Sequence, residues 1–287
     1  MILLPSFQYM KKIKSTLFTI ALSFLMIWQA QAQINARMFR YPDVSDTQIC
    51  FVYAGDIWVV NKNGGTAQRL SSPKGSESFP RFSPDGQTIA FNGNYGGNTD
   101  VYTIPTKGGV PTRVTYHSYS EIVLDWHPNG QQILFASGRQ SGRARYNQFY
   151  LINKKGGFAK KLPLVQAEFG SFSPDGKKIA FTDKSRVFRN WKRYRGGTAP
   201  DIFIYDMASS KSQNITNNKA NDELPMWNGD KVYYLSDQGA NKRYNIWAYD
   251  TKTKQNTQLT KFKDFDIHFP SIGNKDMVFE AGGKLYL

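Results

Sequence analysis

The chain repeats one short pattern along most of its length. Three copies are nearly identical, FSPDGQTIAF (82–91), WHPNGQQILF (126–135) and FSPDGKKIAF (172–181), and they are separated by 44 and 46 residues. Repetition at a period of about 20–50 residues is typical of solenoids and propellers. Weaker copies bring the number to six, and they end at Phe51, Tyr234 and Phe279.

Each repeat predicts four short strands. After the turn the residues alternate, with Ile89 and Phe91 on one side and Ala90 on the other, which is the period of a strand. A third strand follows, where a polar residue precedes two apolar ones, as in DIW (56–58). A Gly-Gly turn and a short fourth strand complete the unit. Four-stranded units at this period favour an all-β fold, a six-bladed β-propeller of antiparallel blades.

The carboxylates that recur in the repeats and the single thiol have structural explanations. Asp85 and Asp175 lie in Pro-Asp-Gly turns, where an Asp side chain bonds to its own backbone, so they are interpreted as turn residues and not as catalytic acids. Cys50 occupies a position that is small and apolar in other copies, which predicts a buried filler. As the only cysteine it excludes an intrachain disulfide.

The last repeat stops early. The sequence ends in GKLYL, within the third strand of the sixth unit, so an incomplete last blade is predicted. An apolar strand without its outer neighbour is an aggregation hazard. We therefore expect the sequence to be part of a longer polypeptide.

The N-terminal segment has the pattern of a secretory signal peptide. A basic start at Met10, the apolar stretch 15–28 and the small residues Ala30 and Ala32 predict cleavage after Ala32. A membrane anchor is the alternative for this stretch. The expected organisation is a signal peptide over 1–32 and a propeller over 33–287, in an exported protein that is periplasmic or secreted. Removing this segment lowers the formal net charge from +15 to +12, which still favours anionic partners.

One loop is exceptionally long and basic. Twenty positions separate Phe181 from Asp201 in the fourth repeat, against 5 to 13 in the others. Together with the equivalent loop of the third repeat it gathers Arg and Lys on one rim, which are Arg139, Arg143, Arg145, Lys184, Arg186, Arg189, Lys192, Arg193 and Arg195. An ordinary solvated loop is one interpretation. Capture of peptide carboxylates or other anions is the other, because the Arg fork suits these groups.

The string NWKRYRGGTAPDIFIYD (190–206), lying behind FSPDGKKIAF in the fourth repeat, resembles the first propeller of tricorn-type serine peptidases. Its core, Trp191 to Thr198, is more specific than the Pro-Asp-Gly repeats, which also occur in TolB-like propellers. The resemblance covers Gln33 to Leu287. It implies a noncatalytic N-terminal propeller that guides peptide substrate or product passage, in a longer enzyme whose catalytic residues lie beyond Leu287. The Arg pair that anchors a substrate carboxylate in this family has no counterpart, because His117 and Ser118 stand there.

No catalytic centre is predicted within the sequence itself. The three histidines, His117, His127 and His268, lack metal-ligand spacing, no G-x-S-x-G motif occurs, and no cofactor or metal is expected. Nucleic acid is disfavoured as a partner because the sequence has no recognised binding motif. The expected partners are peptides or a protein, the rest of a longer chain, and a second copy in a homo-oligomer. A free-standing periplasmic TolB-like propeller that serves as an interaction module is the alternative function.

Overall fold

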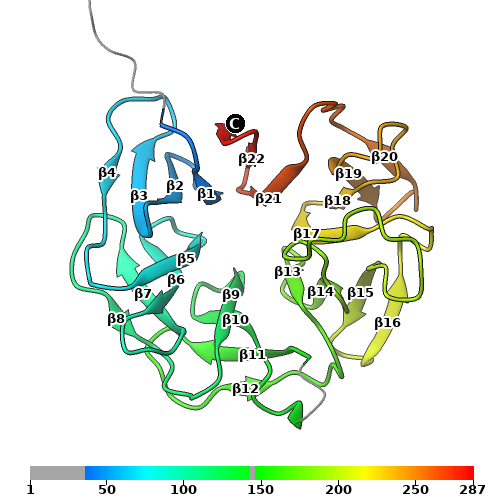
Figure 1. Cartoon of the computed structure of the whole chain (residues 1–287). Coiled ribbons are helices and arrows are strands. Elements are labelled where there is room, and N and C mark those ends of the chain that lie inside the picture. Colours follow the sequence, from blue (N-terminus) through cyan, green and yellow to red (C-terminus); the bar gives the residue numbers. More distant parts are fainter. Residues whose placement is uncertain (1–35, 143–145) are drawn as a thin grey trace, which may run out of the picture. The chain divides into compact units, whose positions relative to one another are not determined.

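The computed structural model describes residues 36–142 and 146–287, so the predicted signal peptide lies outside the described residues. Residues 38–287 form one compact unit. In this unit six antiparallel sheets are arranged radially about an axis, each with its first strand nearest the axis (Figure 1). The described residues contain no helix, and therefore none that could cross a membrane.

The strands follow one another within each sheet in chain order. The first two blades contain β1 (Arg40–Val44), β2 (Gln48–Tyr53), β3 (Asp56–Asn61), β4 (Gln68–Arg69), β5 (Ser76–Phe82), β6 (Thr88–Asn94), β7 (Asp100–Pro105) and β8 (Thr112–Arg113). Blades three and four contain β9 (Glu121–Trp126), β10 (Gln132–Ser137), β11 (Gln148–Asn153), β12 (Lys160–Lys161), β13 (Phe169–Phe172), β14 (Lys178–Thr182), β15 (Ile202–Asp206) and β16 (Lys211–Asn214). The last two contain β17 (Asp222–Asn228), β18 (Lys231–Ser236), β19 (Asn245–Asp250), β20 (Asn256–Gln258), β21 (Ile267–Ile272), β22 (Met277–Ala281) and β23 (Lys284–Tyr286).

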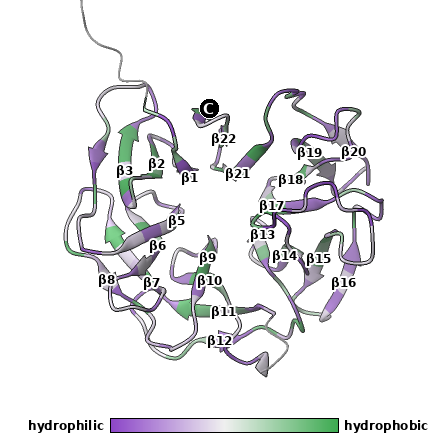
Figure 2. Cartoon of the chain, in the orientation of Figure 1, coloured by the Kyte–Doolittle hydropathy of each residue, from purple (hydrophilic) through white to green (hydrophobic). Residues whose placement is uncertain are grey.

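This architecture confirms the predicted six-bladed propeller, with four strands in five blades and three in the sixth. The middle strands carry the apolar residues that pack one blade against the next, whereas outer strands such as β4 and β16 are hydrophilic (Figure 2). Cys50 is fully buried between the first two blades, as its small apolar position predicts.

Buried acids of the inner strands join neighbouring blades. Glu77 of blade two accepts the amide of Ile57 (2.8 Å) and the hydroxyl of Ser71, both from blade one. Glu121 of blade three repeats this arrangement with Val101 and Thr115 of blade two. Because each acid satisfies a backbone donor of the preceding blade, these contacts fix the angle between adjacent sheets.

The seam between blades six and one is closed by side chains, without a shared sheet among the described residues. Asp43 accepts a hydrogen bond from Ser271, and Lys62 forms an ion pair with Asp276. The ring of Tyr41 packs edge-on against Phe269 at 4.5 Å between ring centres. Ring closure therefore depends on a small set of identifiable contacts.

The inner strands are bulged where they approach the axis. In four of them the residue before a proline has a positive φ: Tyr41 (50°), Phe79 (51°), Leu224 (53°) and Phe269 (42°). The sheet register skips at each of these pairs. A bulge leaves its residues out of the ladder and re-aims their side chains. Here it directs large apolar groups toward the axis.

Candidate functional site

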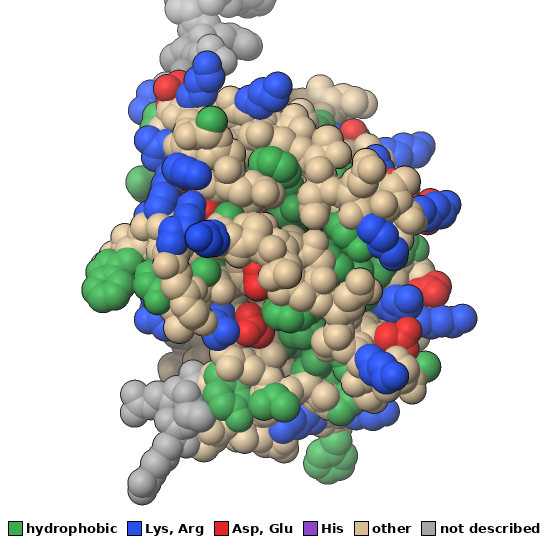
Figure 3. Space-filling view, turned by 90° about the vertical axis from the view of Figure 1, so that its right-hand side faces the viewer, with side chains coloured by type: hydrophobic (Ala, Val, Ile, Leu, Met, Phe, Trp, Pro, Cys, Tyr) green, Lys and Arg blue, Asp and Glu red, His purple; other side chains and the backbone are tan. Residues whose placement is uncertain are grey.

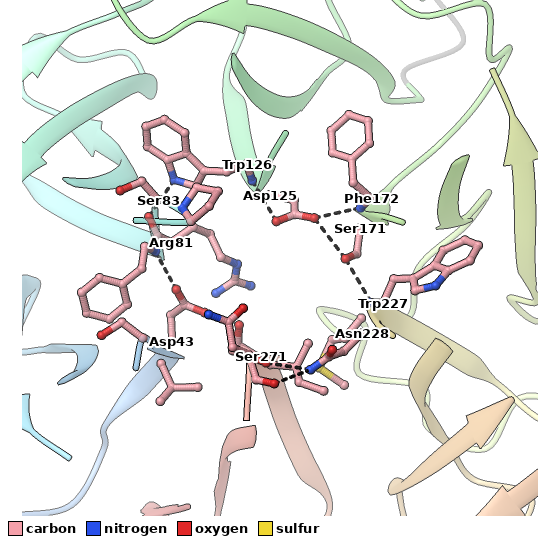
Figure 4. Close-up of a pocket in the computed structure, with 18 of the residues that line it drawn as sticks. Asp43, Arg81, Ser83, Asp125, Trp126, Ser171, Phe172, Trp227, Asn228 and Ser271 are labelled. Atoms are coloured by element: carbon pink, nitrogen blue, oxygen red, sulfur yellow. Dashed lines mark hydrogen bonds between the residues drawn. The ribbon is translucent and has the colours of Figure 1, made fainter. Parts of the chain in front are cut away.

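An open cavity lies on the axis at the side of the Pro-Asp-Gly turns. Its volume is about 600 Å³, and residues from all six inner strands line it. Ligand sites commonly have 300–1,000 Å³, roughly the volume seen here. The close-up in Figure 4 shows its polar side chains converging from several blades.

One equivalent position in each inner strand forms the cavity wall. The six residues at this position differ in chemistry: two are acids, one is a cation, two carry hydroxyls and one carries a thioether. They are Asp43, Arg81, Asp125, Ser171, Met226 and Ser271. A ring of six identical side chains would offer no preferred orientation to a ligand. This ring is asymmetric, and its only formal positive charge is on Arg81.

The two acids of the ring are tied into the wall. Asp43 accepts the amide of Phe82 at 2.6 Å as well as the Ser271 hydroxyl, so it joins blades six, one and two. Asp125 accepts the amide of Phe172 at 2.8 Å and the hydroxyl of Ser171 at 3.0 Å, both from blade four. Burial raises the pKa of Asp43, and it raises the pKa of Asp125 to about 6.

Arg81 is held differently. Its Nε donates to the carbonyl of Leu124 at 3.1 Å, and its Nη1 donates to the carbonyl of Pro80 at 3.1 Å. The indole of Trp126 donates in turn to the carbonyl of Arg81 at 2.9 Å. Figure 4 shows the guanidinium pointing into the centre of the cavity. Within the described residues, no carboxylate forms an ion pair with it.

Below this polar ring the axis is closed by an apolar layer. The side chains of Phe79, Leu224 and Phe269 at the bulges belong to one buried cluster, which also includes Phe169 of the regular strand β13. Phe188, from the long loop of blade four, packs on three of these rings, with centres 5.6 Å from Phe269 and 6.2 Å from Phe79 and Phe169. The cavity is therefore blind.

A single buried carboxylate anchors the start of this loop. Glu223 of blade five accepts the Ser185 hydroxyl (2.6 Å) and the amides of Arg186 (2.6 Å) and Val187 (3.1 Å). Its other oxygen accepts the hydroxyl of Tyr244 at 2.8 Å. The side chain is fully buried, which raises its pKa despite these bonds.

The basic residues predicted for the rim divide into paired and exposed side chains. Arg193 and Arg195 reach across to acids of blades six and five, Asp266 (2.7 Å) and Asp237 (2.9 Å). Arg139 is nearly buried and pairs with Glu121, so it supports the blade instead of facing outward. The others are Arg186, which stacks on Tyr194, Lys184, which pairs with Asp183, and the exposed Arg189 and Lys192.

Arg143 and Arg145 lie outside the described residues. Lys and Arg side chains are spread over both edges of the view in Figure 3, with acids among them. Positive charge therefore does not set the long loop of blade four apart from the rest of the surface. What sets it apart is that its side chains contact other blades and the aromatic rings at the axis.

The axial cavity is the part of the site that the repeat pattern does not predict. Its signals are present in the sequence: an aromatic or apolar residue before proline at the start of four repeats, and Arg81 where other repeats have Asp, Ser or Met. The repeat pattern does not predict the bulge in the inner strands, because a bulge is defined by the register between paired strands. No cluster of metal-binding side chains occurs in residues 36–142 and 146–287.

Arg195 is expected to contribute to stability as well as to surface charge. In the variant R195S the fully buried Asp237 loses a charged partner, so the free energy of unfolding should fall by about 1–2 kcal/mol. Lys192→Ser is the matched control, because this exposed residue makes no ion pair with the described residues. Chemical denaturation of both variants measures the difference. Equal stabilities would show that the pair with Asp237 has no net effect.

The domain should become less stable as the pH rises from about 4 to 7. Burial raises the pKa of Asp125 to about 6 and those of Asp222 and Glu280 to about 7, above their ordinary values near 4. The folded state then binds more protons than the unfolded state in this interval, so acidification stabilises it. The lowered pKa values of His117 and His268 oppose this below about pH 6.5, but the acids with raised pKa values outnumber them.

Thermal melts at pH 5 and pH 8 measure this effect, and the expected rise at pH 5 is several degrees, about 2–4 °C per kcal/mol. Glu280→Gln should flatten the dependence, because a neutral amide stays neutral throughout. A melting temperature that is higher at pH 8 would contradict the prediction.

Comparison with known proteins identifies the domain. The model of the tricorn protease N-terminal beta propeller domain matches residues 36–287. The chain belongs to this family. The resemblance predicted from Trp191 to Thr198 is thus confirmed.

The tricorn relatives are much longer than this sequence. A tricorn protease homolog of Saccharolobus solfataricus is 28% identical over 260 residues, which is 87% of this chain and 23% of that protein. Tricorn protease homolog 1 of Streptomyces coelicolor is 27% identical, with 86% and 23% covered. The chain thus spans about a quarter of the length of these relatives.

Solved structures show the same fold. The tricorn protease matches with a TM-score of 0.76 and 23% identity, over 88% of this chain and 25% of that one. A TolB-type protein from Agrobacterium tumefaciens matches with a TM-score of 0.65 and 17% identity, over 86% and 83%. Both comparisons agree with the predicted likeness to tricorn and TolB-like propellers.

Proposed function

We propose that this domain is the noncatalytic N-terminal propeller of an exported tricorn-like serine peptidase, and that it binds peptides and guides substrate or product. Membership of the tricorn N-terminal family supports the assignment, since the relatives carry this propeller in about a quarter of their length. The observation that carries the binding role is the blind, asymmetric axial cavity with Arg81 at its centre. The catalytic serine would lie in further domains of the longer chain.

The structure bears on how such guidance would work. An apolar layer and Phe188 close the axis, so peptides would enter and leave the cavity by the same mouth while the loop stays in place. The basic loop side chains that are exposed, Arg189 and Lys192, would attract acidic peptides to the opposite face.

Sequencing beyond codon 287, followed by peptidase assays of the whole polypeptide, tests the assignment. A second propeller and a serine peptidase module are expected, and deletion of the present propeller should lower turnover of long peptides more than that of dipeptide substrates. A stop codon after the sixth blade would remove the peptidase assignment.

The alternative is a free-standing TolB-like propeller that binds a protein partner, favoured by the fold match over most of the A. tumefaciens chain. It predicts a completed sixth blade followed by termination. In that case the partner, or a second copy in a homo-oligomer, would be retained by the domain in pull-down or sedimentation experiments.

A further inference from the structure

We propose that the axial cavity is a carboxylate-binding site, in which Arg81 binds a terminal or side-chain carboxylate of a peptide. This inference rests on the proposed peptide-binding function and specifies its chemistry. Arg81 lies within a concave site of about 600 Å³ and uses only two of its N–H groups on the protein. Arg carries five such groups in a planar fork, which matches a carboxylate in two-point contact.

The guanidinium of Arg81 is held in place by the protein backbone. Its Nε and Nη1 are fixed by the carbonyls of Leu124 and Pro80, each 3.1 Å away, so the side chain does not need to be ordered when a ligand arrives. Long cationic side chains usually lose conformational freedom on binding. A guanidinium that is already held in place avoids much of this cost.

Four acids line the cavity together with Arg81. Asp43 and Asp125 each have both oxygens engaged by amides or hydroxyls of the wall, and their charges act on Arg81 from the same ring. Figure 4 shows the guanidinium, with N–H groups still available, directed to the centre. Asp46 and Asp85 lie in the turns at the mouth. A peptide with a carboxylate at the floor and a basic side chain near the mouth would complement this arrangement.

The cavity is closed at its floor. The layer of Phe79, Phe169, Leu224 and Phe269 lies beneath the polar ring, and Phe188 covers it from the far side. An extended chain cannot thread through such a floor. A group that ends a chain or a side chain can reach it, and a carboxylate is the group that the guanidinium recognises.

Calorimetric titration of the protein with four peptides tests the proposal. The probes are Ala-Lys-Ala-Leu as the free acid, its C-terminal amide, its N-acetylated free acid, and acetyl-Ala-Lys-Ala-Asp-amide. The free acid and its acetylated form should bind with similar affinity, and the Leu amide at least tenfold more weakly. Binding of the Asp-containing amide as tightly as the free acid would assign a side-chain carboxylate as the ligand, and its failure to bind would assign the chain terminus.

Two variants examine the role of Arg81. R81M keeps the length of the stem and should abolish the preference for the acid over the amide, while R69M, a change in an exposed outer strand, should retain it. Circular dichroism verifies that both variants fold. If R81M does not fold, the comparison of acid and amide on the unaltered protein decides alone.

Three results would overturn the carboxylate site: equal binding of acid and amide, a preference that survives in R81M, or loss of binding on acetylation but not on amidation, which would indicate an ammonium site formed by the acids. The absence of binding by every probe would overturn it too. Peptidase activity in the longer chain would leave the peptidase assignment standing in each case, so failure of the carboxylate site and failure of that assignment are distinguishable.

Discussion

Replacing Glu223 by alanine should release the long loop of blade four from the axis. The variant leaves the Ser185 hydroxyl and the amides of Arg186 and Val187 without their buried acceptor, and it removes the partner of Tyr244. An unpaired buried donor costs about 1–3 kcal/mol. The loop donors can reach water once the loop opens, so they do not each cost this full amount. We therefore expect a total loss of about 3 kcal/mol in the free energy of unfolding.

Hydrogen exchange measured by mass spectrometry should show faster exchange over 185–198 in this variant, with the blades still protected. Ser185→Ala removes only one of the bonds and provides the matched control, with a smaller change in the same segment. If the segment exchanged at the same rate in both variants and in the unaltered protein, the loop would be held by something other than Glu223.

The second large effect is expected at the seam of the ring. Asp43→Ala removes the acceptor of the Phe82 amide and of the Ser271 hydroxyl, and with them the link from blade one to blades two and six. Both donors lie in buried surroundings, so the free energy of unfolding should fall by about 2–4 kcal/mol. Urea denaturation followed by tryptophan fluorescence measures the change.

Asp46→Ala is the matched control, because Asp46 bridges the same seam to Asn274 at 3.1 Å but is exposed. An exposed substitution of this kind usually changes stability by no more than about 0.5 kcal/mol. Similar losses in the two variants would show that burial does not distinguish these contacts, and the closure of the ring would then need another explanation.

The sequence predicts the fold well because three repeats share the same turn, alternation and spacing, and weaker copies extend the series to six. The copies at 82–91, 126–135 and 172–181 all form the end of a first strand, the turn and a second strand. Local signals of this kind depend on neighbours in the chain. The blade number then follows from counting the copies.

The site is harder to predict because its parts are far apart in the chain. Ser271 binds Asp43 across 228 positions, and Phe188 meets Phe79 only when the ring closes. Arg193 and Arg195 are basic residues of a loop in the sequence, but their acids, Asp266 and Asp237, come from other blades. Charge alone therefore could not separate the side chains that stabilise the loop from those that face solvent.

The bulged inner strands connect the two ends of the axis. At Phe79-Pro80 and at Leu124 the backbone leaves the ladder, and the apolar side chains there contribute to the layer that closes the axis. The same departures free the carbonyls of Pro80 and Leu124, and both accept hydrogen bonds from Arg81. A substitution that straightened either strand would thus open the apolar floor and also misalign the guanidinium of Arg81. The closed floor and the position of Arg81 therefore depend on the same bulges.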